Sequence, residues 1–228
     1  MLATPSPEIL PNATPLASGL LGPEQPVGSL SLPAQLITSL RLTPQQFAQL
    51  CEANPEAVLE LAADGTLIPM TPTGSDTGAR NGELFFQIKA WARASGGWMA
   101  FDSSTGFRLP DDSVLSPDAS LLAMDRWRVL TPEQRRGFAP LCPDLVVELA
   151  SPGDEGPRGL TALRHKLAAY QRNGARLGWL LIPSERAVEV WGPLETGEEG
   201  RRIEAATRLE GDPVFPGLVI DLEPIWAS

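Results

Sequence analysis

Residues 141–152 read Leu-Cys-Pro-Asp-Leu-Val-Val-Glu-Leu-Ala-Ser-Pro, a short apolar run between two prolines. Leucine and valine favour strands and proline interrupts them, so the run predicts a strand with a breaker on each side. Both faces of that strand are mostly apolar, which is typical of a strand in the middle of a sheet. Glu148 is the exception, because a buried carboxylate is costly unless a metal ion, a cation or hydrogen bonds accept it. The function therefore depends on what Glu148 binds.

The composition predicts one domain with an extension. The chain has 228 residues, 43% of them hydrophobic, against roughly 100–200 residues for a typical domain. Residues 1–40 are rich in Pro, Ser, Gly and Leu and nearly uncharged, so we expect an extended or disordered N-terminal arm, whose leucines could instead pack on the domain or a partner. Residues 41–228 would form the folded domain. The net charge of −10 argues against broad, nonspecific affinity for nucleic acid, but not against a local basic cleft.

Three further patterns narrow the class of protein. There is no apolar run of about 18 residues or more, and the first residues lack the basic flank and apolar core of a secretory signal. Two cysteines do not make a disulfide framework, and His165 is the single histidine, so a zinc site is not expected. We therefore expect a cytoplasmic protein that does not enter a membrane.

The order of the elements predicts a mixed sheet with helices packed against it, an α/β or α+β domain. A capped helix at Thr43-Pro44 comes first, followed by a hairpin at 58–70 with its turn at Ala63-Asp64-Gly65. The other expected elements are a helix at 80–94, strands at 98–101, 105–109 and 114–123, a polar helical insert at 127–139, a helix at 160–173, strands at 177–183 and 187–191, a charged turn at 195–202 and a last strand within 213–222.

Helical spacing separates the polar side chains that face the sheet from those that face water. Asn81 points with the apolar stripe of its helix, as a cap or as a site residue, and both interpretations stay open. Lys166 lies at the edge of the apolar stripe of the helix expected at 160–173 and can extend its amine toward the sheet. His165 points away from the sheet, and we expect it to be exposed.

Asp118, Glu148 and Lys166 form the constellation that could carry chemistry. Asp118 and Glu148 lie on successive strands, and neighbouring strands are about 4.8 Å apart, so the two carboxylates can share one ion. Two carboxylates with waters and a phosphate oxygen suit Mg²⁺ or Mn²⁺, and a lysine beside them can orient or deprotonate water or hold developing charge. The alternative is a partly buried ion pair between Glu148 and Lys166, with Asp118 capping a turn.

Several stretches in consistent order over residues 40–227 resemble the Uma-two family of restriction endonucleases. They are Pro72-Thr73-Gly74 to Arg80-Asn81, Phe101 to Phe107, Ser116 to Ser120, Cys142 to Pro152, Lys166 to Ala175, Leu177 to Leu180 and Pro216 to Leu222.

The resemblance implies a restriction-endonuclease-like core of the PD-(D/E)XK nuclease superfamily and a divalent-metal site. By position, Asp118 and Glu148 correspond to the two acidic ligands of one or two Mg (or Mn) ions. Lys166 is similar to a catalytic lysine displaced from the strand to the following helix. Glu60 and Asn81 match recurrent polar positions as supporting residues, and Ala150 stands where the superfamily's strand lysine would be.

Two functional hypotheses follow. The first is a Mg²⁺-dependent endonuclease that hydrolyses DNA phosphodiester bonds, expected as a homodimer by analogy with the twofold symmetry of the duplex. The second is a catalytically inactive nuclease fold that acts as a binding or assembly module, suggested by Ala150, the acidic charge and the apolar arm. A basic rim drawn from Arg80, Arg108, Arg158, Arg164 and Arg172 would favour the first.

Overall fold

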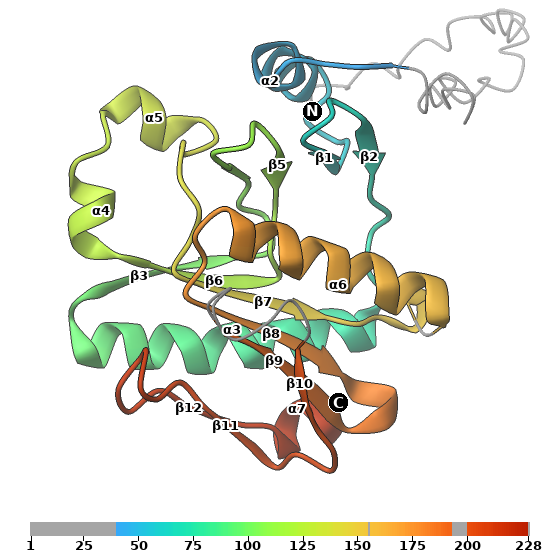
Figure 1. The fold of residues 1–228 in the computed structure, drawn as a ribbon, viewed down its shortest axis with the longest axis vertical. Coiled ribbons are helices and arrows are strands. Elements are labelled where there is room, and N and C mark those ends of the chain that lie inside the picture. Colours follow the sequence, from blue (N-terminus) through green and yellow to red (C-terminus); the bar gives the residue numbers. More distant parts are fainter. Residues whose placement is uncertain (1–39, 155, 193–199, 228) are drawn as a thin grey trace, which may run out of the picture. The chain divides into compact units, whose positions relative to one another are not determined.

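A six-stranded sheet forms the centre of the fold in the computed structural model, which describes residues 40–154, 156–192 and 200–227 (Figure 1). The predicted arm up to residue 39 and most of the predicted charged turn at 195–202 lie outside these residues. The strands run in the order β10 (Arg201–Ile203), β9 (Ala187–Trp191), β8 (Leu177–Ile182), β7 (Leu145–Leu149), β6 (Ala119–Ala123) and β3 (Trp98–Asp102).

The sheet is mixed because one connection is a helical crossover. Helix α6 (Pro157–Arg172) joins β7 to β8, and these two strands are parallel, with Glu148 opposite Leu180. A parallel pair needs a long connection of this kind, whereas the other neighbouring pairs in the sheet are antiparallel. The expectation of a mixed sheet flanked by helices is confirmed.

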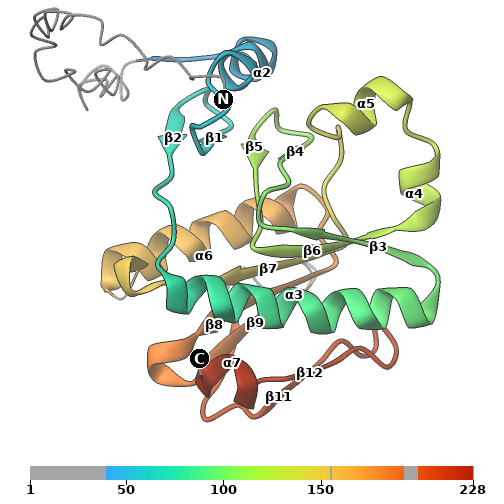
Figure 2. The same cartoon turned by 180° about the vertical axis from the view of Figure 1, so that it is seen from behind.

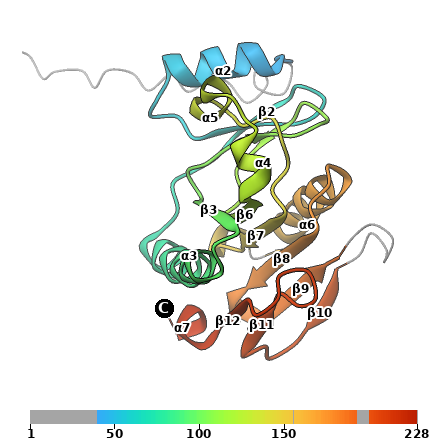
Figure 3. The same cartoon turned by 90° about the vertical axis from the view of Figure 1, so that its left-hand side faces the viewer.

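Each face of the sheet packs against a different helix, as Figure 3 shows edge-on. Helix α3 (Ser75–Ser95) covers one face, where Leu84 and Ile88 join Val147 and Trp179 in one core cluster. Helix α6 covers the other, where Leu167 joins a second cluster. Burial on both sides explains why β7 reads as a continuous apolar run.

A second, four-stranded sheet lies beside the large one, and its strands come before and after β3 in the chain (Figure 2). Its order is β2 (Leu67–Pro69), β1 (Leu59–Leu61), β5 (Val114–Leu115) and β4 (Phe107–Arg108). Helix α2 (Pro44–Ala53) begins with a capping box between Thr43 and Gln46, and its Phe47 packs with Leu61. The predicted capped helix and hairpin are both confirmed.

Short elements complete the described structure. They are the 3₁₀ turns η1 (Pro152–Asp154) and η2 (Pro183–Glu185), helices α4 (Met124–Arg128), α5 (Pro132–Arg136) and α7 (Glu223–Ala227), and the hairpin of β11 (Arg208–Glu210) and β12 (Val219–Asp221). Within the described ranges, no helix is long and apolar enough to cross a membrane.

Several boundaries differ from the sequence predictions. The strand expected at 114–123 is split at Ser116-Pro117-Asp118 into β5 and β6, which belong to different sheets, because proline cannot donate to a ladder. The insert expected at 127–139 is two short helices, separated where Thr131 caps a new one. Helix α3 begins at Ser75 rather than residue 80 and includes Gly78. Arg202 lies in β10 and not in a turn.

Candidate active site

The antiparallel register of β6 and β7 brings Asp118 and Glu148 side by side. Ala119 pairs with Val147, and Asp118 and Glu148 are the next residues along the two strands. The split of the predicted long strand creates this position, since Asp118 occupies the bend between the two sheets. Glu148 is nearly fully buried and Asp118 is half-buried.

Both oxygens of Asp118 are hydrogen bonded. Oδ2 accepts from the Leu149 backbone N–H at 2.7 Å, and Oδ1 accepts from the Asn81 amide at 3.1 Å. Asn81 lies in the second turn of α3, so of its two interpretations the cap does not hold and the side chain meets Asp118. The Asn81 Oδ1 atom is buried and has no hydrogen-bond partner among the described residues.

The amine of Lys166 lies against Glu148 on its other side. Nζ is 3.0 Å from Oε1 and 3.2 Å from Oε2 of Glu148, and only 12% of the lysine side chain is exposed. The side chain is therefore largely buried while its amine meets the carboxylates, as the sequence predicts. His165, the residue before Lys166 in the helix, is exposed as expected.

Glu60 joins the same amine from the other sheet. Its Oε1 lies 2.8 Å from the Lys166 Nζ and also accepts the Ser116 N–H at 2.7 Å, while the Ser116 carbonyl accepts from Nζ at 2.9 Å. The lysine therefore bridges β1, the bend after β5, and β7. Ser116 was not among the sequence candidates, because its contribution is a backbone carbonyl that no residue pattern reveals.

Burial sets the protonation behaviour of these groups. It raises the pKa of Glu148 to about 8, although the ammonium of Lys166 opposes the shift. Burial also raises the pKa of Asp118, again against Lys166 and its hydrogen bonds. Burial alone would lower the pKa of Lys166, but the carboxylates of Glu148 and Glu60 raise it well above its ordinary value, so the lysine is an ammonium.

The donor set suits a hard divalent cation. Three carboxylates, Glu60, Asp118 and Glu148, face one ammonium, so with all four groups ionised the cluster carries two uncompensated negative charges. The unpartnered Asn81 oxygen is a further hard donor beside Asp118. Within the described ranges, no three His, Cys, Asp or Glu side chains converge as a metal cage. Mg²⁺ does not need one, since it usually takes one or two carboxylates and keeps several waters.

One further buried polar side chain lies on the same helix as Lys166. Tyr170, four residues after Lys166, buries a hydroxyl without a hydrogen-bond partner in the described structure, and burial raises its pKa.

Two arginines expected on a basic rim of the site are paired with acidic side chains. Arg108 is bound to Asp112, and Arg164 is bound to Glu189. A surface hollow of about 440 Å³ lies between α2 and α5 and contains none of the candidate residues.

Comparisons with known proteins agree with this picture. The model of the Uma2 family, described as "Putative restriction endonuclease", matches residues 44–223. A crystal structure from Anabaena variabilis, of "a putative nuclease belonging to DUF820", is similar with a TM-score of 0.65 and 19% identity, over 82% of this chain and 98% of that one. No curated protein matches.

The structural likeness establishes the fold, so the expected restriction-endonuclease-like core is confirmed. The family match extends over most of the chain, from α2 to α7, and agrees with the resemblance carried by the sequence motifs. The chain belongs to the Uma2 family, and its core has the restriction-endonuclease-like fold.

Proposed function

We propose that the protein is a Mg²⁺-dependent endonuclease that hydrolyses phosphodiester bonds in DNA. The observation that carries the proposal is the placement of Asp118, directly before β6, beside Glu148 of β7, with the Lys166 amine 3.0 Å from Glu148. Asp118 and Glu148 would hold one or two Mg²⁺ or Mn²⁺ ions. Family membership supports a nucleic acid as the substrate.

A bound divalent ion supplies charge stabilisation at the phosphoryl group and lowers the pKa of a bound water. Asn81 fixes the orientation of Asp118 through its amide, and the Leu149 N–H fixes the second oxygen. Preset ligands of this kind avoid reorganisation during the reaction.

Lys166 contributes as a cation. Because its pKa is raised by Glu148 and Glu60, although burial opposes the shift, the amine keeps its proton near neutral pH and is a poor general base. It can orient a water or hold negative charge that develops on the phosphate. The sequence left three roles open for Lys166: orienting water, deprotonating water and holding developing charge. The raised pKa supports the first and the third.

A homodimer would suit an enzyme that cuts both strands of a twofold symmetric duplex, and a cytoplasmic location would suit action on DNA. Both belong to the proposal and rest on analogy with the family.

The proposal is tested by titrating Mg²⁺ and Mn²⁺ into the wild type, Asp118→Ala and Glu148→Gln by calorimetry, and by incubating the same proteins with supercoiled and linear DNA. We expect metal-dependent nicking by the wild type and none by either variant. Asp144→Asn is the matched control, because Asp144 is buried like Glu148 but pairs with Arg126 beyond the other end of β7. Cleavage that persists unchanged in Asp118→Ala would refute the assignment.

A second function, a nuclease fold that binds or assembles without cleaving, is favoured by one observation. Among the described residues, the Lys166 amine contacts Glu60, Glu148 and the Ser116 carbonyl. A lysine held this way must release a partner before it meets a phosphate. A folded wild type that binds DNA but neither cleaves it nor binds metal, with DNA present or absent, would support this second function.

A further inference from the structure

Charged residues form a row across the large sheet, on the face that α6 covers. Glu148 of β7 pairs with Leu180 of β8, Leu180 pairs with Glu189 of β9, and Glu189 pairs with Arg202 of β10. Side chains paired in this way point to the same face of a sheet. Glu148 and Glu189 therefore lie on the two sides of Leu180, about 10 Å apart at two strand spacings.

Helix α6 lies over this row, and one cationic side chain extends from each flank of the helix toward the sheet. Leu167 is fully buried at the centre of the helix stripe. By the helical period, Lys166 lies about 100° to one side of Leu167, and Arg164 lies about 60° to the other side. The lysine reaches Glu148, and the arginine reaches Glu189.

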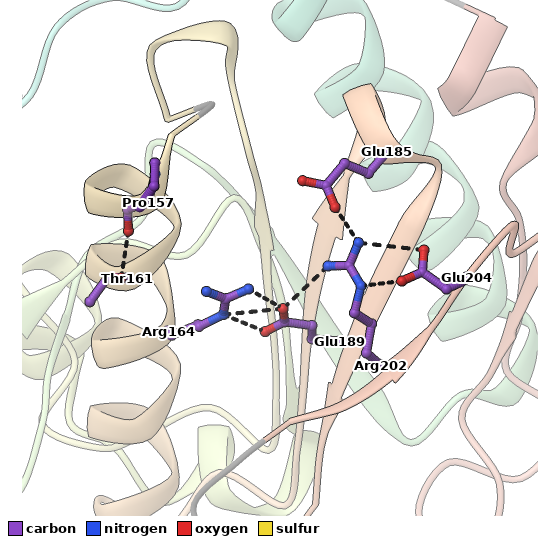
Figure 4. Close-up of polar contacts among 7 residues, drawn as sticks. All are labelled: Pro157, Thr161, Arg164, Glu185, Glu189, Arg202 and Glu204. Carbon is purple, nitrogen blue, oxygen red and sulfur yellow. Dashed lines mark hydrogen bonds and ion pairs between the residues drawn. The ribbon is translucent and has the colours of Figure 1, made fainter.

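Arg164 contacts Glu189 through two of its nitrogens (Figure 4). Nε lies 3.1 and 3.0 Å from the two carboxylate oxygens, and Nη2 lies 2.5 Å from Oε1. The Glu189 side chain is only 5% exposed. A planar guanidinium bound through several donors fixes direction as well as distance.

Glu189 is itself held in place. Arg202 approaches its Oε1 to 3.6 Å from β10 and is fixed in turn by Glu185 and Glu204 (Figure 4). The carboxylate that anchors α6 is therefore joined to two further carboxylates through the second arginine. This gives the flank of α6 opposite Lys166 a firm attachment.

We propose that Arg164 and Glu189 are positioning residues for Lys166. They set the rotation of α6 about its axis and so place the lysine amine between Glu60 and Glu148. At a helix radius of about 5–6 Å, a rotation of about 10° moves a flank atom by about 1 Å. A shift of that size is enough to disturb a catalytic arrangement. The consequence for catalysis rests on the proposed function, whereas the placement of the amine does not.

The placement can be measured without any activity, because Lys89 and Lys166 are the two lysines of the whole chain. Lys89 lies on α3, on the other side of the sheet, and serves as an internal standard. Brief acetylation of the folded protein, followed by peptide mass spectrometry, gives the labelling rate of each lysine. In the wild type we expect Lys89 to react and Lys166 to be protected.

Arg164→Ala should raise the labelling of Lys166 relative to Lys89 by about fivefold or more, which corresponds to about 1 kcal/mol. The matched control is Arg126→Ala, since Arg126 is similarly exposed and also pairs with a buried carboxylate, but lies on α4. The proposal is overturned if Lys166 stays protected in a folded Arg164→Ala protein. It is equally overturned if Arg126→Ala exposes Lys166 as much.

Glu189→Gln keeps the shape of the side chain, and it provides a second test of the positioning role if Arg164→Ala does not fold. It should expose Lys166 in the same direction, and unchanged protection would overturn the proposal. In a cleavage assay, both variants should lower kcat with little change in KM. A wild type that does not cleave DNA would count against the proposed function only, because the labelling result stands by itself.

Discussion

Asp118 accepts a 2.7 Å hydrogen bond from the backbone N–H of Leu149, the residue next to Glu148. One proposed metal ligand is thus bound to the strand that carries the other. The spacing of the two carboxylates is then a property of the β6–β7 ladder and not of two independent side chains. Substitutions at Asp118 should therefore affect folding as well as metal binding.

Asp118→Ala should lower the free energy of unfolding by about 1–3 kcal/mol, because it leaves the Leu149 N–H without its acceptor. Asp118→Asn keeps an oxygen that can accept this bond, so it should lose less stability while it still loses metal affinity. Urea unfolding of both variants measures the difference. Equal stability of the wild type and Asp118→Ala would contradict the role of this hydrogen bond.

Lys166→Met should be more destabilising, by about 3–5 kcal/mol, because it leaves buried carboxylates without their cation. Adding Glu148→Gln to Lys166→Met should restore part of the loss, since the double variant removes one of the uncompensated charges. A double-mutant cycle by chemical denaturation gives the coupling energy. Strictly additive effects would show that the amine and Glu148 do not interact in solution.

Metal binding should tighten as the pH rises toward about 8. Burial raises the pKa of Glu148 to about 8, so below that value a proton competes with the metal for the carboxylate. Release of one proton gives about a tenfold gain in affinity per pH unit between pH 6 and 8, with a plateau above. Calorimetry in buffers of different ionisation enthalpy measures the proton release, which should disappear in Glu148→Gln.

The same raised pKa has a defined effect on stability without metal. The folded state binds this proton more tightly than the unfolded state, so Glu148 stabilises the fold most below pH 4.5, and that contribution is lost as the pH rises through about 8. Urea unfolding of the metal-free protein at several pH values, compared with Glu148→Gln, isolates this contribution. An identical pH dependence in the two proteins would contradict it.

The two cysteines should react very differently with a thiol reagent. Cys51 is partly exposed, whereas Cys142 is buried beneath α6 and lies 3.4 Å from the Tyr170 carbonyl oxygen, and burial raises its pKa to about 12. We expect one thiol to react in the folded protein and the second only in denaturant. Because the folded thiol holds its proton, its contribution to stability should fall as the pH rises above 9. Rapid reaction of both thiols in the native protein would argue against this packing.

The sequence predicts the parts of the fold that have local causes. The strand at Leu145–Leu149 follows from its apolar run and prolines, and the helix beginning at Pro44 follows from its capping residues. The pairing of Asp118 with Glu148 was expected from successive strands, although the two halves of the strand around Asp118 were not separated. A residue pattern indicates an extended backbone but does not say which sheet each half joins.

The contacts that the sequence does not predict are those between distant elements. Glu60 reaches Lys166 from a different sheet, and Glu189 of β9 reaches Arg164 on the crossover helix α6. Both glutamates interrupt apolar strands, as Glu148 does, so their burial could be suspected from the pattern alone. The identity of their partners depends on the registers of several strands, which no local propensity determines.

The row from Glu148 to Arg202 also limits how the sheet can assemble. A slip of one residue in β7 would turn every side chain to the opposite face. Glu148 would then enter the apolar cluster around Leu84 and Trp179, far from any cation of α6, while Val147 would face Lys166. Each charged group proposed for catalysis therefore meets its partner only in the native register of this strand. In this way the site helps to select the fold that forms it.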